Sequence, residues 1–129
     1  MSRYLTAEQV LFLHSRLIQE TGGAHGVRDL SMLLSGLGKP QATFDGSELH
    51  TELFSKGAVL MDSLIRNHPF LDGNKRNAIA ATGLFLRLNG FSLVLDCDEM
   101  VHFTLGCAQS EMELSEISAW LRIHCITIE

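Results

Sequence analysis

Residues 66–78 read RNHPFLDGNKRNA, a polar stretch between two apolar segments of a chain that is 46% hydrophobic. Pro69 cannot continue the helical pattern before it, because proline lacks a backbone N–H and clashes with the preceding turn. Gly73 then permits a tight turn, and a second helical pattern follows. We therefore expect a loop that joins two helices and delivers polar side chains to the N-terminus of the second. Composition alone leaves open whether this is an ordinary polar loop or a site.

The rest of the sequence predicts an all-α bundle in a single domain, residues 1–129. Thr6 and Gln9 form a capping-box pattern, and Gly22-Gly23 end the helix that it opens. Gly83 and the alanines around it indicate close packing, so the helix after the loop should be central. Further helices are expected at about 29–37 with Asp29 as N-cap, 47–67 with Ser47 as N-cap, 77–88, 99–109 with Asp96 or Asp98 as N-cap, and 114–124, with a short extended piece at 91–96.

Bulk properties exclude several classes of protein. A net charge of −5 and a pI of about 5.6 argue against direct nucleic-acid binding, which needs a basic face. The N-terminus lacks the apolar core of a signal peptide, and no segment has the length of uncharged apolar residues that a membrane span needs. The three cysteines form no CxxC pair and are interpreted as small hydrophobes. We expect a cytoplasmic protein without a membrane partner.

The loop carries the groups that phosphoryl or nucleotidyl transfer requires. A helix N-terminus offers free N–H groups, and the amides from Gly73 to Arg76 are expected to form an anion-binding nest. Lys75 and Arg76 add full positive charges that match phosphate oxygens. Asp72 is suited to hold Mg²⁺ beside a phosphate, and His68 is the natural general base.

The string HPFLDGNKR resembles the signature of the Fic/Doc family, H-P-F-x-[D/E]-G-N-[G/K]-R, and matches it at every specified position. GVRDLSMLLSGLGKPQATFDG and GLFLRLNGFSL resemble the death-on-curing (Doc) branch, and the resemblance covers about residues 4–120. It implies a Fic-fold helical bundle with a small flap loop or hairpin. It also implies an enzyme that uses Mg²⁺ and ATP to modify a hydroxyl on a bacterial protein.

The resemblance assigns roles to residues of this chain. It makes His68 the base for the target hydroxyl, Phe70 the buried anchor of the loop and Asp72 the Mg²⁺ ligand. Together with the chemistry above, the expected ATP-binding residues are Gly73, Asn74, Lys75, Arg76 and Asn77, with His68, Lys75 and Arg76 catalytic. Asn77 is open to a second interpretation, a solvated first helical residue. The expected flap, which would hold the target backbone in extended form, consists of Lys39, Pro40, Gln41, Ala42, Thr43 and Phe44.

Two departures from the AMP-transferring members of the family indicate the Doc branch. Lys75 stands where AMP-transferring members have glycine, and Ile79 stands where they have a second arginine. The Doc branch implies transfer of the γ-phosphate, so protein phosphorylation is the first hypothesis. AMP transfer is the alternative within enzymes, and a catalytically silent protein-binding module is the alternative from another class.

The resemblance also implies partners. Inhibited Fic proteins carry a glutamate followed by Gly or Asn on an inhibitory helix, and no glutamate of this chain has that neighbour. Inhibition is therefore expected from a small antitoxin in trans, and elongation factor Tu is the implied target. Outside the motif, Arg28 and Asp29 are interpreted as a helix-start pair. His25 is interpreted first as an ordinary surface histidine, although the turn at residues 24–29 could approach the motif.

Overall fold

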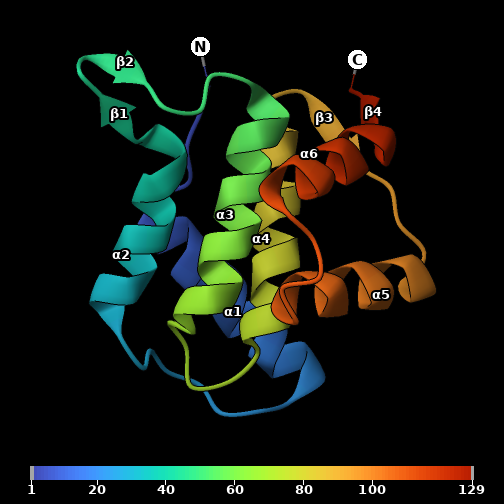
Figure 1. Cartoon of the computed structure of the whole chain (residues 1–129). Coiled ribbons are helices and arrows are strands. Elements are labelled where there is room, and N and C mark those ends of the chain that lie inside the picture. Colours follow the sequence, from blue (N-terminus) through green and yellow to red (C-terminus); the bar gives the residue numbers. More distant parts are fainter. Residues whose placement is uncertain (1, 129) are drawn as a thin grey trace.

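The computed structural model describes residues 2–128, most of which lie in six α-helices (Figure 1). Two small antiparallel sheets of two strands each complete the fold. In chain order the elements are α1 (Ala7–Thr21), α2 (Leu30–Gly38), a 3₁₀ turn (Lys39–Gln41), β1 (Thr43–Phe44), β2 (Ser47–Glu48), α3 (Leu53–Asn67), α4 (Asn74–Leu88), β3 (Phe91–Leu93), α5 (Cys97–Ala108), α6 (Leu114–Ile123) and β4 (Cys125–Thr127).

Side-chain caps explain where several helices begin. Thr6 accepts from the Gln9 amide while the Gln9 side chain accepts from the Thr6 amide, which is the predicted capping box of α1. Asp29 caps α2 by accepting from the Met32 amide. Asp96, one of two candidates in the sequence, caps α5. These three predicted starts are confirmed.

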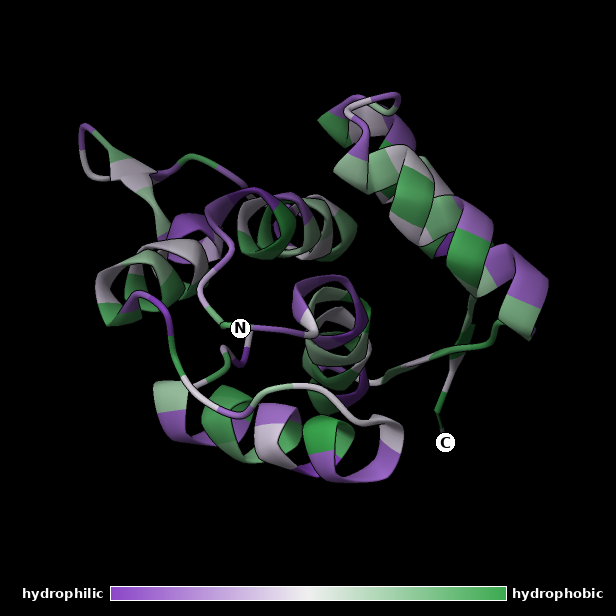
Figure 2. Ribbon diagram, turned by 90° about the horizontal axis from the view of Figure 1, so that it is seen from below, coloured by the Kyte–Doolittle hydropathy of each residue, from purple (hydrophilic) through white to green (hydrophobic). Residues whose placement is uncertain are grey.

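The central pair of the bundle is α3 and α4, which lie side by side in Figure 1. Viewed from below in Figure 2, the other helices are arranged around this pair. The placement of the helix after the loop at the centre is thus confirmed. The buried core includes Val10, Leu33, Leu60, Met61, Leu64, Phe70, Ala78, Phe85, Leu86, Ile117 and Leu121, and it holds the two ends of the polar loop in fixed places.

The start of α3 differs from the prediction. Ser47 does not cap a helix but lies in β2, paired with Phe44 across a turn in which Asp45 and Gly46 have φ of 53° and 82°. Such an Asp-Gly turn closes a hairpin, and α3 begins only at Leu53. The predicted end of α3 at Asn67 is confirmed.

Lys56 ties this hairpin to α3. Its side chain is 3% exposed and donates to Ser2 Oγ at 3.0 Å and to Glu48 Oε1 at 3.3 Å. Burial lowers the pKa of Lys56, but hydrogen bonds with Tyr4 and Glu48 outweigh it and leave the pKa above its ordinary value. The hairpin is therefore attached to the N-terminal half of α3.

The last strand has no counterpart in the sequence prediction. β3 was expected as an extended piece, and its partner is β4, with Phe91 opposite Thr127 and Leu93 opposite Cys125.

No helix within residues 2–128 is both long and apolar enough to cross a bilayer. All three cysteines are free, and burial raises the pKa of the Cys107 thiol to about 12.

Gly83 in α4 gives a test of the packing. The sequence suggested a close helix contact at Gly83, but an added Cβ would meet no atom within 4 Å. We predict that Gly83→Ala raises the free energy of unfolding by about 0.5–1 kcal/mol, because alanine favours a helix interior over glycine. Chemical denaturation measures the change.

Gly73→Ala is the matched control for Gly83→Ala. Gly73 has a φ of 73°, and its Cβ would lie 3.1 Å from Ile18 Cδ1, so this variant should lose stability. A loss of stability in Gly83→Ala would contradict the open surroundings of that position.

Candidate active site

The polar loop is bounded by two residues in left-handed conformation. His68 follows the last residue of α3 with φ 45° and ψ 57°, and Gly73 precedes α4 with φ 73° and ψ 21°. A non-glycine residue seldom adopts this region, and such strain persists only where the surroundings impose it. The loop geometry therefore depends on what holds residues 68 to 73.

The backbone of residues 24–29 holds one edge of the loop. Val27 and Phe70 form an antiparallel bridge, and the Leu71 amide donates to the Gly26 carbonyl at 3.1 Å. The amides of Arg28 and Asp29 both donate to the Pro69 carbonyl, at 2.8 and 3.0 Å. The two segments run together at the end of α3 in Figure 1. The backbone of residues 24–29 thus approaches the motif, while His25 itself is exposed and does not line the groove described below, in agreement with a surface histidine.

The Arg28 side chain holds the carbonyls on either side of the α3 terminus. Its Nε donates to the His68 carbonyl at 2.6 Å, and its Nη2 donates to the Asn67 carbonyl at 2.8 Å. A charged planar donor can satisfy two neighbouring acceptors, which stabilises the left-handed turn at His68. Sequence reasoning interpreted Arg28 only as a helix-start residue and missed this contact. The neighbouring Asp29 is the N-cap of α2. The pKa of its carboxyl is lowered by hydrogen bonds, first from the Ser31 hydroxyl and second from the Met32 amide.

Asn74 clamps the centre of the loop. Its Oδ1 accepts from the Phe70 amide and its Nδ2 donates to the Phe70 carbonyl, both at 3.0 Å. Phe70 is 1% exposed, as expected of the buried anchor, so its backbone groups need these partners. The side chain of Asn74 is therefore used inside the loop, and its backbone N–H is the group that it offers to an anion.

His14 of α1 supports the loop from beneath. Its ring stacks on Phe70 with centroids 3.7 Å apart and planes 7° from parallel. Its Nε2 lies 2.7 Å from the Asp72 carbonyl oxygen, and the side chain is 3% exposed. Sequence reasoning missed His14. Its position on the apolar face of α1, between Val10 and Ile18, is the sequence signal that could have indicated its burial.

The loop and the first turn of α4 line a groove of about 410 Å³. Among residues 2–128 no side chain caps the N-terminus of α4, and Asn74, Lys75 and Arg76, whose amides have no partner within the helix, all line this groove. The Gly73 amide is predicted to belong to the anion-binding nest, but in the structure it donates to Asp72 Oδ1 at 2.9 Å. The residues lining the groove are His68, Leu71, Asp72, Gly73, Asn74, Lys75 and Arg76.

Asn77 does not join this group. It lies in the fourth position of α4, is 1% exposed and does not line the groove. The interpretation of Asn77 as a solvated first helical residue is wrong, because α4 begins three residues earlier at Asn74. Its side-chain nitrogen has no hydrogen-bond partner in the described part of the chain.

The chemistry of Asp72 fits a magnesium ion that binds together with a nucleotide. Asp72 lines the groove, and its carboxylate oxygens accept single hydrogen bonds from the Gly73 amide and, at 3.3 Å, from the Ala24 amide. Further lone pairs are left for a cation. Residues 2–128 contain no cluster of three His, Cys, Asp or Glu side chains for a metal. Mg²⁺ needs none, because phosphate and water complete its shell around one or two carboxylates.

The predicted flap does not lie at the groove. Lys39–Gln41 form a 3₁₀ turn, Thr43 and Phe44 form β1, and none of these residues lines the groove. α2 leads away from the loop, so the hairpin after it contacts α3 near Lys56. His68 is twelve positions after Lys56, which is about 18 Å along a helix, and Figure 1 shows the hairpin at the other end of α3. The segment beside the loop is instead 24–29.

The wall next to the groove becomes apolar one turn along α4. Ile79, at the position where AMP-transferring Fic proteins have a second arginine, is 7% exposed. It lines two adjoining cavities of about 200 and 410 Å³ with Arg76 and Met100. Because Ile79 supplies no positive charge, the cations of α4 that line the polar groove are Lys75 and Arg76.

Comparisons with known proteins agree with this arrangement. The description "Fic/DOC family" applies to the family whose profile matches residues 4–86. The chain is 43% identical over 98 residues to "Toxin Doc" of Mycolicibacterium smegmatis, covering 76% of this chain and 73% of that protein. It is 34% identical over 120 residues to "Protein kinase doc" of Escherichia phage P1, covering 93% and 94%.

Asn74 provides a test of the loop clamp. We predict that Asn74→Ala lowers the free energy of unfolding by about 1–3 kcal/mol, because the buried backbone groups of Phe70 lose both partners. In the control Asn74→Asp, the carboxylate still accepts from the Phe70 amide and suits a helix N-terminus, so a smaller loss is expected. Chemical denaturation of the three proteins is the measurement, and wild-type stability in Asn74→Ala would refute the clamp.

Proposed function

The chain belongs to the Fic/DOC family, and from this premise we propose that it is a protein phosphotransferase of the Doc type. It transfers the γ-phosphate of ATP to a hydroxyl side chain of a bacterial protein. The observation that carries the proposal is the shared groove, in which His68 lies with Lys75, Arg76 and the open N-terminus of α4. A base and a phosphate-binding helix terminus in one groove are what transfer to a hydroxyl requires.

The residues of the groove have separate tasks in this reaction. His68 accepts the proton of the target hydroxyl as its oxygen attacks the γ-phosphorus and the bond to ADP breaks. The amides at the start of α4 bind phosphate oxygens, and Lys75 and Arg76 stabilise the charge on the transferred group. Arg28 keeps the backbone of His68 in place through the His68 carbonyl. Asp72 would hold Mg²⁺, which neutralises phosphate charge when bound.

The choice of phosphate over AMP rests on the cations of α4. Lys75 is exposed and reaches three cavities, so its ammonium fills space that glycine would leave for a phosphate. Ile79 replaces a cation with a buried apolar side chain. The grip on a nucleotide's far end is thereby weakened, while the grip next to His68 is kept. Both features favour a terminal phosphate beside the base. We place the reaction in the cytoplasm, with elongation factor Tu as the first target to test.

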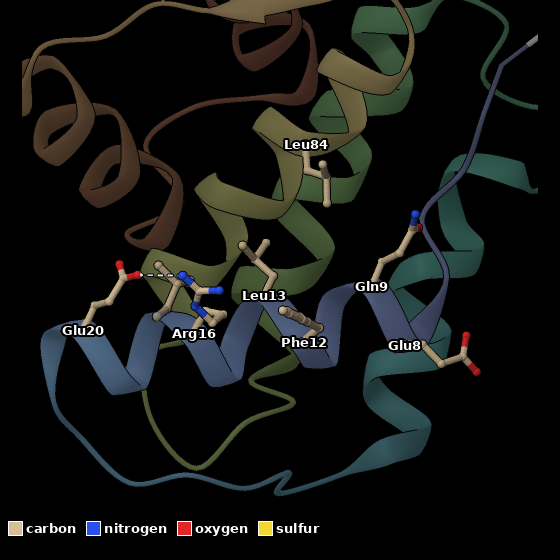
Figure 3. Close-up of a pocket in the computed structure, with 8 residues that line it drawn as sticks. Glu8, Gln9, Phe12, Leu13, Arg16, Glu20 and Leu84 are labelled. Carbon is tan, nitrogen blue, oxygen red and sulfur yellow. Dashed lines mark ion pairs between the residues drawn. The ribbon is translucent and has the colours of Figure 1, made fainter.

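We further propose that a small antitoxin binds in a trough on the face formed by α1, α4 and α5. A cavity of about 640 Å³ lies between α1 and α4, and its lining residue Leu17 also lines the 410 Å³ cavity beside Ile79. That second cavity adjoins the 200 Å³ cavity, which Lys75 lines. Figure 3 shows Phe12, Leu13 and Leu84 at its start, with Glu8, Arg16 and Glu20 along the edge. An amphipathic helix suits such an apolar trough with charged edges, and its far end would cover Arg76.

His68 gives the test of the transfer reaction. We predict that His68→Ala lowers the rate of label transfer from γ-labelled ATP to the target by about 10²- to 10⁴-fold, because the general base is lost. The matched variant His68→Asn tolerates the left-handed backbone yet lacks a basic imidazole, so it should be equally inactive and better folded. Wild-type rates in His68→Asn would refute the role of the base. A wild-type protein that transfers no label would favour a silent binding module.

Phe12 gives the test of the antitoxin trough. Phe12 is 54% exposed, and we predict that Phe12→Glu weakens inhibition by the protein encoded beside this chain at least about tenfold. The transfer rate without that inhibitor should not change. Phe44→Glu, on the distant hairpin and 77% exposed in the wild type, is the control and should remain fully inhibited. Inhibition constants from titrations give the comparison, and equal inhibition of both variants would contradict the trough.

A further inference from the structure

We propose that His14 is a positioning residue for the Asp72 carboxylate, acting through the peptide group that joins Asp72 to Gly73. This inference rests on the proposed role of Asp72 as the Mg²⁺ ligand. His14 lies on α1, 58 residues before Asp72 in the sequence, and is not among the residues that line the groove. Its own surroundings nevertheless connect it directly to the metal-binding end of the loop.

The hydrogen bond of His14 fixes the direction of one peptide plane. A carbonyl oxygen can only accept, so Nε2 of His14, 2.7 Å from the Asp72 oxygen, must carry the proton. The N–H at the other end of the same peptide belongs to Gly73 and donates to Asp72 Oδ1 at 2.9 Å. Because the peptide group is planar, holding its carbonyl also aims its N–H. His14 therefore determines where the carboxylate finds its donor.

The position of His14 is itself fixed. The ring is 3% exposed and lies flat against Phe70, which is 1% exposed. Asn74 locks the Phe70 backbone on both its N–H and its carbonyl. The imidazole is thus held between a rigid helix and a clamped aromatic ring, with its Nε2–H directed at the Asp72 carbonyl. A side chain with so little freedom can transmit its position to the loop.

The peptide would have freedom to turn without this contact. Gly73 has a φ of 73° and no side chain, so the loop there has the flexibility of glycine. The second support of the carboxylate is the Ala24 amide at 3.3 Å, a longer contact from the exposed turn after α1. A Cβ at Gly23 would lie 2.7 Å from Asp72 Oδ2, so a side chain there would displace the carboxylate. The carboxylate is therefore set between two backbone amides, and His14 aims the nearer one.

Two substitutions separate the ring of His14 from its proton. His14→Phe keeps a stacking ring but has no donor, whereas His14→Gln keeps a donor at the same reach and has no ring. We expect His14→Phe to raise the Mg²⁺ concentration for half-maximal transfer by about 10- to 100-fold, the usual effect of losing a group that orients a metal ligand. His14→Gln should restore most of the wild-type requirement. The maximal rate at saturating Mg²⁺ should change much less than the requirement.

The second readout uses the metal-free protein and needs no activity. Hydrogen exchange of the Gly73 amide should be faster in His14→Phe than in wild type and His14→Gln, because that amide loses its fixed partner. The nitrogen chemical shifts of the His14 ring in wild type should show a protonated Nε2. The ring shifts are measured on the wild-type protein, so they can be obtained even if His14→Phe does not fold.

The outcomes are distinct. A bare Nε2 in wild type, or an unchanged Gly73 exchange rate and Mg²⁺ requirement in His14→Phe, would overturn the positioning role. Equal losses of stability and maximal rate in both variants, with an unchanged Mg²⁺ requirement, would assign His14 a packing role only and would also overturn it. If the wild-type protein transfers no label, the proposed function fails, while the ring shifts and the Gly73 exchange still decide whether His14 aims the peptide.

Discussion

The site depends on one constraint, the fixed course of the backbone from Asn67 to Gly73. His68 is held in a left-handed conformation that a histidine seldom adopts, and it is the residue that must face the groove. The carbonyls of residues 67, 68, 69, 70 and 72 all accept hydrogen bonds from groups outside the stretch 67–73. These donors come from α1, the 24–29 segment and the start of α4. The proposed base and the proposed phosphate-binding terminus are thus aligned by groups that do not take part in the proposed reaction.

This constraint explains why the loop needs most of the bundle. α1 supplies His14, α2 is capped by Asp29 beside the Arg28 clamp, and α3 and α4 fix the two ends. Preorganised donors act on developing charge without reorganising during the reaction, which is where much of the rate of such enzymes arises. The proposed trough for an antitoxin lies on the face of α1, α4 and α5, beside these supports. An inhibitor there could cover Arg76 without touching His68.

Short-range signals predicted the fold well, and long-range contacts were beyond them. Thr6, Asp29 and Asp96 are caps whose residue types reveal helix starts, and Pro69 and Gly73 reveal the loop between α3 and α4. Ser47 misled because the Asp45-Gly46 turn uses it in a strand, a local alternative that capping preferences do not weigh. The flap was misplaced because the direction in which α2 leaves the loop is decided by packing. Arg28 and His14 were missed because their partners are backbone carbonyls about 40 and 58 residues away, which carry no sequence signal.

The central claim is that this groove presents the terminal phosphate of ATP to a hydroxyl held at His68. ATP labelled separately at its α- and γ-phosphates, incubated with the protein, Mg²⁺ and bacterial target proteins, tests it most directly. The account predicts that the γ-label alone becomes bound to protein and that replacing His68 by asparagine abolishes it. Retention of the α-label on protein would show AMP transfer and contradict the account.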